Sequence, residues 1–217
     1  MVKEASHLAN SRVLPGFSTP AVGFEAPFDM LEACHERVAD RLALLKRLPI
    51  HLQANGCDSQ ARQAAADVLR YFDLAAPLHH QDEEIHVFPH LLASADRILV
   101  KAVMGLHLQH RVMEETWGRL RQVLQAVATC ENSAAEPCRV LAASAVLGFT
   151  VLYDDHIRLE EAVIYPAARR AMGTRQTQTM SADMMLRRGS APQAVTLTPF
   201  QKATRLRIDS ASGLGSG

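Results

Sequence analysis

A repeated motif of eighteen residues constrains this chain more than any other feature. Residues 72–89 and 149–166 align without a gap, and both copies read F-x6-H-x3-E-E-x3-[FY]-P. The copies are 77 positions apart. The matched pairs are Phe72 and Phe149, His79 and His156, Glu83 and Glu160, Glu84 and Glu161, and Phe88 and Tyr165. Two copies in register indicate that the chain is built from two related units.

A second pair of histidines extends the repeat beyond the motif. His35 and His110 lie 75 positions apart, and each is followed by apolar residues three, seven and ten positions later. That spacing is typical of one face of a helix. Each unit therefore reads as a helical hairpin with one histidine on its first helix and H-x3-E on its second. A pseudo-two-fold axis is expected to relate the two hairpins.

The pattern of apolar residues predicts an all-α fold. Aromatic residues make up only 5% of the chain, which favours helix over strand. Pro49 should end or kink the first helix, Pro77 should kink the second, and Gly173 should stop the fourth. Short connections predict an up-down-up-down antiparallel four-helix bundle. The expected helices span residues 27–48, 59–89, 96–129 and 137–172.

The chain divides into a folded part and two ends. Residues 1–26 read as an irregular arm, residues 27–172 as the bundle, and residues 173–217 as a disordered, flexible tail with at most a short helix near 180–187. The net charge is −4 over residues 1–170 and +4 beyond them, so the bundle lacks the basic surface of a nucleic-acid binder. Neither a leader peptide nor a membrane span is evident, and a cytoplasmic location is the expectation.

The spacing H-x3-E suits metal binding. Residues four apart on a helix project from one face, so an imidazole and a carboxylate can reach the same ion. Two such pairs plus one histidine from each remaining helix give four nitrogens and two carboxylates. This set is too large for one tetrahedral ion and suits two ions that share the carboxylates. Nitrogen and oxygen donors without thiolate favour iron or manganese over a structural zinc site.

These residues resemble the hemerythrin-like HHE cation-binding family, whose motif is H…H-x3-E…H…H-x3-E. The resemblance covers about residues 28–172 and implies two iron ions with an oxo or hydroxo bridge, with manganese or zinc as alternatives. Oxygen-carrying members have a further histidine one turn away on the third helix, where this chain has Leu106 and Glu114. The ligands that the resemblance implies are His35, His79, Glu83, His110, His156 and Glu160.

The sequence gives weaker evidence for a role in the metal site for several other residues near the motif. Glu114, His107, His86 and Tyr153 are candidates for supporting contacts or alternative ligation, although packing or exposure would explain each of them. His80 follows a proposed ligand directly and should point about 100° away from it, toward the helix surface. Glu84 and Glu161 are expected to orient ligands or to face solvent.

Two classes of function fit this sequence. In the first, the protein binds or senses O2, NO or peroxide in redox or nitrosative stress, and it is not an enzyme. In the second, it is a di-iron enzyme that consumes peroxide or NO, or that acts in the repair of iron centres. Iron storage or delivery is a third hypothesis with less support. No nucleic-acid or membrane partner is expected.

Overall fold

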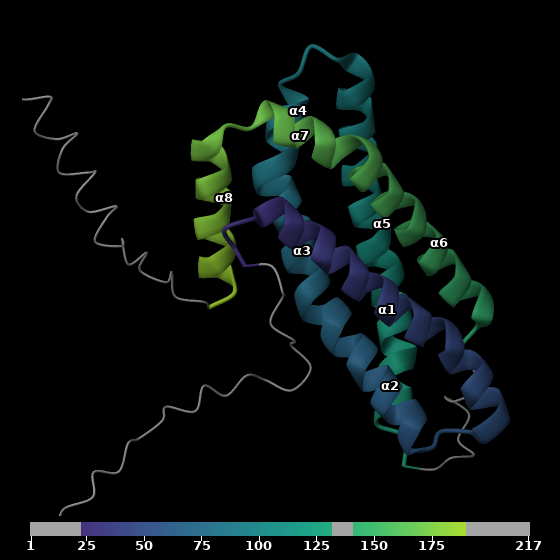
Figure 1. Cartoon of the computed structure of the whole chain (residues 1–217). Helices are drawn as coiled ribbons and strands as arrows, with labels where there is room; N and C mark the ends of the chain where they lie inside the picture. Colours follow the sequence, from purple (N-terminus) through teal and green to yellow (C-terminus); the bar gives the residue numbers. More distant parts are fainter. Residues whose placement is uncertain (1–22, 132–140, 190–217) are drawn as a thin grey trace, which may run out of the picture.

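The computed structural model describes residues 23–131 and 141–189, and the regular structure in these ranges is helical, with no strand (Figure 1). The all-α prediction is therefore confirmed. Two long helices are unbroken: α1 (Pro27–Asn55) and α5 (Arg97–Ala128). Two further runs are built from consecutive pieces. The first contains α2 (Ser59–Arg70), a π-helical turn (Tyr71–Ala75), α3 (Ala76–Asp82), a second π-helical turn (Glu83–Val87) and α4 (Phe88–Leu92). The second contains α6 (Ala143–Leu159), a π-helical turn (Glu160–Ile164) and α7 (Tyr165–Ala171).

The helix starts follow local capping chemistry. Asp58 accepts a hydrogen bond from the backbone of Ala61 and caps α2. Asp96 accepts hydrogen bonds from the first backbone amides of α5 in the same way. These side chains satisfy amides that have no partner inside the helix. Gly56, with a positive φ of 69° that suits glycine, ends α1, and its amide donates a hydrogen bond to the carbonyl of Leu52.

The prediction that Pro49 ends the first helix is wrong, because α1 continues through Pro49 to Asn55. A proline inside a helix removes one backbone hydrogen bond. Leu48 and Leu52, on either side of Pro49, are almost completely buried in the core. Their burial stabilises the helical path by more than about 3 kcal/mol, enough to offset the proline.

Each π-helical turn precedes a proline. The turns end at Ala75, Val87 and Ile164, two residues before Pro77, Pro89 and Pro166. A proline has no amide hydrogen, and its ring clashes with the carbonyl four residues earlier, so the helix widens there. Two of these turns begin at Glu83 and Glu160, the carboxylates of the repeated motif. The E-E-x3-[FY]-P sequence thus specifies the backbone that carries both glutamates.

The four runs pack lengthwise around a common core. α1 contacts α2 and α6, and α5 contacts the same two helices from the other side (Figure 1). The core has two apolar clusters, one containing Leu45 and Phe72 and the other containing Leu31 and Leu106. On all four runs the candidate ligands lie in sequence between residues of the two clusters. A polar layer therefore interrupts an otherwise apolar interior.

A further helix, α8 (Thr174–Arg187), packs against the bundle beside α1 and α3 (Figure 1). The short helix expected near 180–187 lies within α8, but the expectation of a flexible tail is wrong for residues 174–187, because Met180 and Met184 are fully buried. The predicted irregular arm falls largely on residues 1–22, and the predicted loop after α5 and the rest of the tail fall on 132–140 and 190–217, all outside the described residues. Among the described helices, none is long and apolar enough to cross a membrane.

Candidate metal centre

The structure brings the six predicted ligands together in one buried layer. Each long run contributes at least one side chain, and no member is more than 4% exposed. The two glutamates are the first residues of their π-helical turns. The ligands and their elements are His35 on α1, His79 on α3, Glu83 after α3, His110 on α5, His156 on α6 and Glu160 after α6.

The first half of the layer is formed around His35 and His79. Their Nε2 atoms face each other at 3.1 Å. Glu160 Oε2 lies 3.2 Å from His35 Nε2, and Glu83 Oε1 lies 3.6 Å from His79 Nε2. The ligand atoms of these four residues lie within 4.8 Å of one another.

The second half repeats this geometry around His110 and His156. Their Nε2 atoms are also 3.1 Å apart. Glu160 Oε1 lies 2.8 Å from His156 Nε2, and Glu83 Oε2 lies 3.5 Å from His110 Nε2. Both glutamates therefore belong to both ligand groups, with one oxygen directed at each half.

The donor atoms fit a pair of cations. Two nitrogens bound at right angles to one ion, each at about 2.1 Å, lie about 3.0 Å apart. The observed separation of 3.1 Å in each half matches this arrangement. Both oxygens of Glu160 and one oxygen of Glu83 have no hydrogen-bond partner among the described residues, although both side chains are fully buried. Buried carboxylates without hydrogen bonds are costly unless a cation compensates them.

Supporting contacts orient three of the four histidines. His35 Nδ1 lies 2.8 Å from Glu161 Oε1, and His110 Nδ1 lies 2.7 Å from Glu84 Oε1. His156 Nδ1 lies 2.8 Å from the side-chain oxygen of Gln109 on α5. An acceptor at Nδ1 keeps the hydrogen there and leaves the Nε2 lone pair directed into the layer. The expectation that Glu84 and Glu161 orient ligands thus has a direct geometric basis.

Without a cation, the buried charges shift one another's protonation. Burial and the charge of Glu160 raise the pKa of Glu83 to about 8. Burial opposes protonation of His110, but the carboxylates of Glu83 and Glu84, 3.5 Å and 2.7 Å from its ring nitrogens, raise its pKa to about 9. In the metal-free protein, protons on His110 and Glu83 therefore compensate the buried negative charge that a cation would otherwise compensate.

Tyr165 is buried in the core and also has a polar contact with the layer. Its hydroxyl donates a hydrogen bond to Glu83 Oε1 and lies 3.2 Å from His35 Nε2. Burial and the nearby charges of Glu83 and Glu160 raise the pKa of Tyr165, so the hydroxyl keeps its proton. The matching residue in the first copy of the repeat is Phe88, which has no hydroxyl. This difference between the two copies was the sequence signal that could have indicated a polar role for Tyr165.

The prediction that His80 faces the helix surface is wrong. Its ring lies against His110, with the ring centroids 3.9 Å apart and the planes inclined by 11°. Its Nε2 atom is buried. A helix in a bundle buries a face at least about 100° wide, so the residue after a ligand can still point inward.

The remaining candidates lie at differing distances from the layer. Tyr153 is buried, and its ring contacts that of His80. His107 is half-buried, with Nδ1 3.6 Å from Glu84 Oε1. His86 instead contacts Asp183 of α8 at 2.7 Å, so its proposed supporting role in the site is not supported. Glu114 is exposed on α5, and the suggestion that it contributes a ligand is wrong for this structure.

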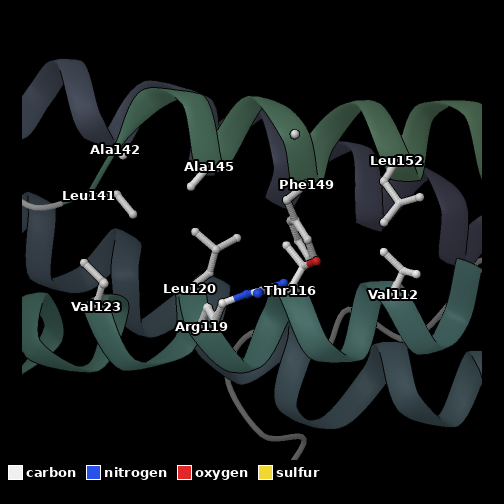
Figure 2. Close-up of a pocket in the computed structure, with 11 residues that line it drawn as sticks. Val112, Thr116, Arg119, Leu120, Val123, Leu141, Ala142, Ala145, Phe149 and Leu152 are labelled. Carbon is white, nitrogen blue, oxygen red and sulfur yellow. The ribbon is translucent and has the colours of Figure 1, made fainter.

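A cavity of about 590 Å³ lies between α5 and α6, away from the ligands (Figure 2). Its walls are mainly apolar, with Leu120, Phe149 and Leu152 pointing into the gap between the two helices. Phe149 contacts Tyr153, which in turn contacts His80. Aromatic rings therefore lie between this cavity and the histidines.

A family model described as the hemerythrin HHE cation-binding domain matches residues 26–168. The chain belongs to this family. All six candidate ligands of this hemerythrin domain lie within the match, whereas α8 lies beyond it. An uncharacterized protein of Haemophilus influenzae is 33% identical over 135 residues, which cover 62% of this chain and 74% of that protein. Together, the hemerythrin domain and the His/Glu groups indicate a metal-binding protein.

Proposed function

We propose that the protein holds two iron ions in this layer and uses them to bind or sense O2, NO or peroxide. One observation carries the proposal: Glu83 and Glu160 are fully buried and belong to both ligand groups. Two carboxylates placed between two pairs of histidines suit two adjacent ions better than one. We also infer the up-down-up-down order of the helices, because each run packs against the run that follows it in the chain.

Iron is the proposed metal because of the donor set. The two groups offer imidazole nitrogens and carboxylate oxygens without a thiolate. Such sites suit iron and manganese, whereas structural zinc sites are mostly closed and tetrahedral. When bound, the iron pair would supply a redox-active centre with room for a small ligand.

The protein's own residues would prepare this centre for a small ligand. The apolar clusters on either side keep bulk water from the layer. The Tyr165 hydroxyl is a buried hydrogen-bond donor beside His35 and Glu83. A donor at this position can orient a small polar molecule on the His35 side of the layer.

The test begins with anaerobic loading of the full chain with Fe(II), followed by metal analysis and absorption spectroscopy. We expect two ions per chain and a spectrum that changes on addition of O2 or NO. Glu83→Ala and Glu160→Ala should each abolish loading of two ions, while Glu115→Ala on the exposed face of α5 serves as the control. Two ions per chain in either variant would refute the assignment of that glutamate, and a spectrum unchanged by O2, NO and peroxide would refute the binding function.

A second candidate function is an enzyme that consumes peroxide or NO, and Tyr165 favours it. A buried hydroxyl that keeps its proton could donate a hydrogen bond to peroxide or NO held beside it. Steady-state assays with peroxide and with NO decide between the two functions. Turnover that exceeds free iron and falls in Tyr165→Phe would support the enzyme, whereas rates equal to free iron would exclude it.

A further inference from the structure

His80 breaks the two-fold symmetry of the ligand layer. It follows His79 directly, whereas the residue that follows His156 in the second copy of the repeat is Ile157. The His80 ring stacks on His110 and meets His156 edge-on, with a centroid separation of 6.0 Å. His80 therefore lies on the His110 side of the layer, across from the half that contains His35.

The Nε2 atom of His80 has an environment typical of a ligand that lacks its ion. This atom is buried and has no hydrogen-bond partner within residues 23–131 and 141–189. A buried polar atom without a partner costs about 1–3 kcal/mol. A nitrogen of His80 also lies within 4.8 Å of nitrogens of His110 and His156. Two nitrogens on opposite sides of one ion lie about 4.2 Å apart, so small side-chain shifts would bring all three to one ion.

We propose that His80 is a fifth histidine ligand and binds the ion held by His110 and His156. The inference rests on the proposed binuclear centre, and it gives the two metal positions different numbers of histidine ligands. One ion would have three imidazoles, and the other would have only His35 and His79 besides the shared carboxylates. The position with fewer protein ligands is the one beside the Tyr165 hydroxyl, and it is therefore where a small molecule binds.

This assignment also explains how the site can have a fifth histidine although the third helix contributes only one. The third helix has no second histidine one turn from His110, because Leu106 and Glu114 occupy those positions. Leu106 is fully buried among apolar residues, and Glu114 is exposed. His80 on α3 supplies from the neighbouring helix the imidazole that α5 does not provide.

The alternative is that His80 only packs against His110, and substitution by phenylalanine separates the two roles. His80→Phe keeps an aromatic ring for stacking and removes the nitrogen. His90→Phe, at a half-buried histidine of α4, is the matched control. The variants are titrated anaerobically with Fe(II), and their Mössbauer spectra are compared with that of the wild type. Circular dichroism of the metal-free proteins checks that each variant is folded.

The proposal predicts that the wild type and His90→Phe bind two ions in distinguishable environments. His80→Phe should bind one ion as before and the second at least about tenfold more weakly. In His80→Ala, added imidazole should restore the second ion. Wild-type affinity for both ions in His80→Phe, with an unchanged spectrum, would overturn the role of His80 and leave the binuclear centre intact. Fewer than two ions in the wild type would overturn the binuclear centre itself, and with it this inference.

Discussion

Glu161 contacts His35 across the boundary between the two halves of the repeat, with 2.8 Å between Oε1 and Nδ1. Glu84 makes the reciprocal contact with His110 at 2.7 Å. Each half of the chain thus orients a histidine that belongs to the other half. The E-E pair of the motif combines two roles, since its first member faces the centre and its second holds a histidine of the partner hairpin.

Removing either supporting glutamate should weaken metal binding. We expect Glu161→Ala and Glu84→Ala each to lower the affinity for Fe(II) by about 10- to 100-fold, because the histidine loses the acceptor that fixes its tautomer. Competition with a chelator of known affinity measures the change, with Glu115→Ala as the exposed control. Affinities equal to that of the wild type would show that the two contacts do not support the ligands.

Much of this site follows from the repeat, because ligand identity depends on local spacing. His79 and Glu83 are four residues apart, so helical geometry alone brings them to one face. The position of His80 could not be predicted in the same way. It depends on how much of α3 is enclosed by its neighbours, which is a property of the packed bundle. The direction of the Tyr165 hydroxyl likewise depends on its distance from Glu83 on another helix.

The helix α8 was not predicted in full because its stability comes from contacts distant in sequence. Most of its exposed positions carry Thr, Gln or Arg, and its buried residues are Met180 and Met184, one turn apart. The helix is held by Arg187 and the adjacent Arg188, which both bind the buried carboxylate of Asp82. No local pattern indicates that Asp82 would be fully buried.

Loss of the Asp82 carboxylate should detach α8 and destabilise the protein. Removing one partner of a buried ion pair costs about 3–5 kcal/mol, and we expect the lower end for Asp82→Ala because both arginines are partly exposed. Chemical denaturation of the metal-free protein measures this change in the free energy of unfolding. Asp155→Ala removes an exposed ion pair with Arg158 and should cost less than about 1 kcal/mol. Equal effects of the two substitutions would contradict the proposed role of Asp82.

Metal removal should make stability depend on pH in a defined direction. The pKa of His110 is raised to about 9 in the metal-free fold, against about 6.5 when unfolded. Its protonated form therefore stabilises the fold fully below about pH 6.5, and this contribution is lost as the pH rises through about 9. Glu83, whose pKa is raised to about 8, acts in the same direction because its buried carboxyl resists deprotonation.

We therefore expect the melting temperature of the metal-free protein to fall between pH 7 and pH 9. The loaded protein should not show this fall, because metal ligands bind in their deprotonated form. Thermal melts followed by circular dichroism, with and without Fe(II), make the comparison. A metal-free protein that becomes more stable over this range would contradict the charge arrangement described for His110 and Glu83.

We propose above all that one buried layer holds two metal ions between two pairs of histidines. The most direct measurement is an anomalous difference map at the iron edge, from crystals of the Fe(II)-loaded protein. The claim predicts two peaks, one beside His35 and His79 and one beside His110 and His156, with Glu83 and Glu160 contacting both. A single peak, or none in this layer, would contradict it.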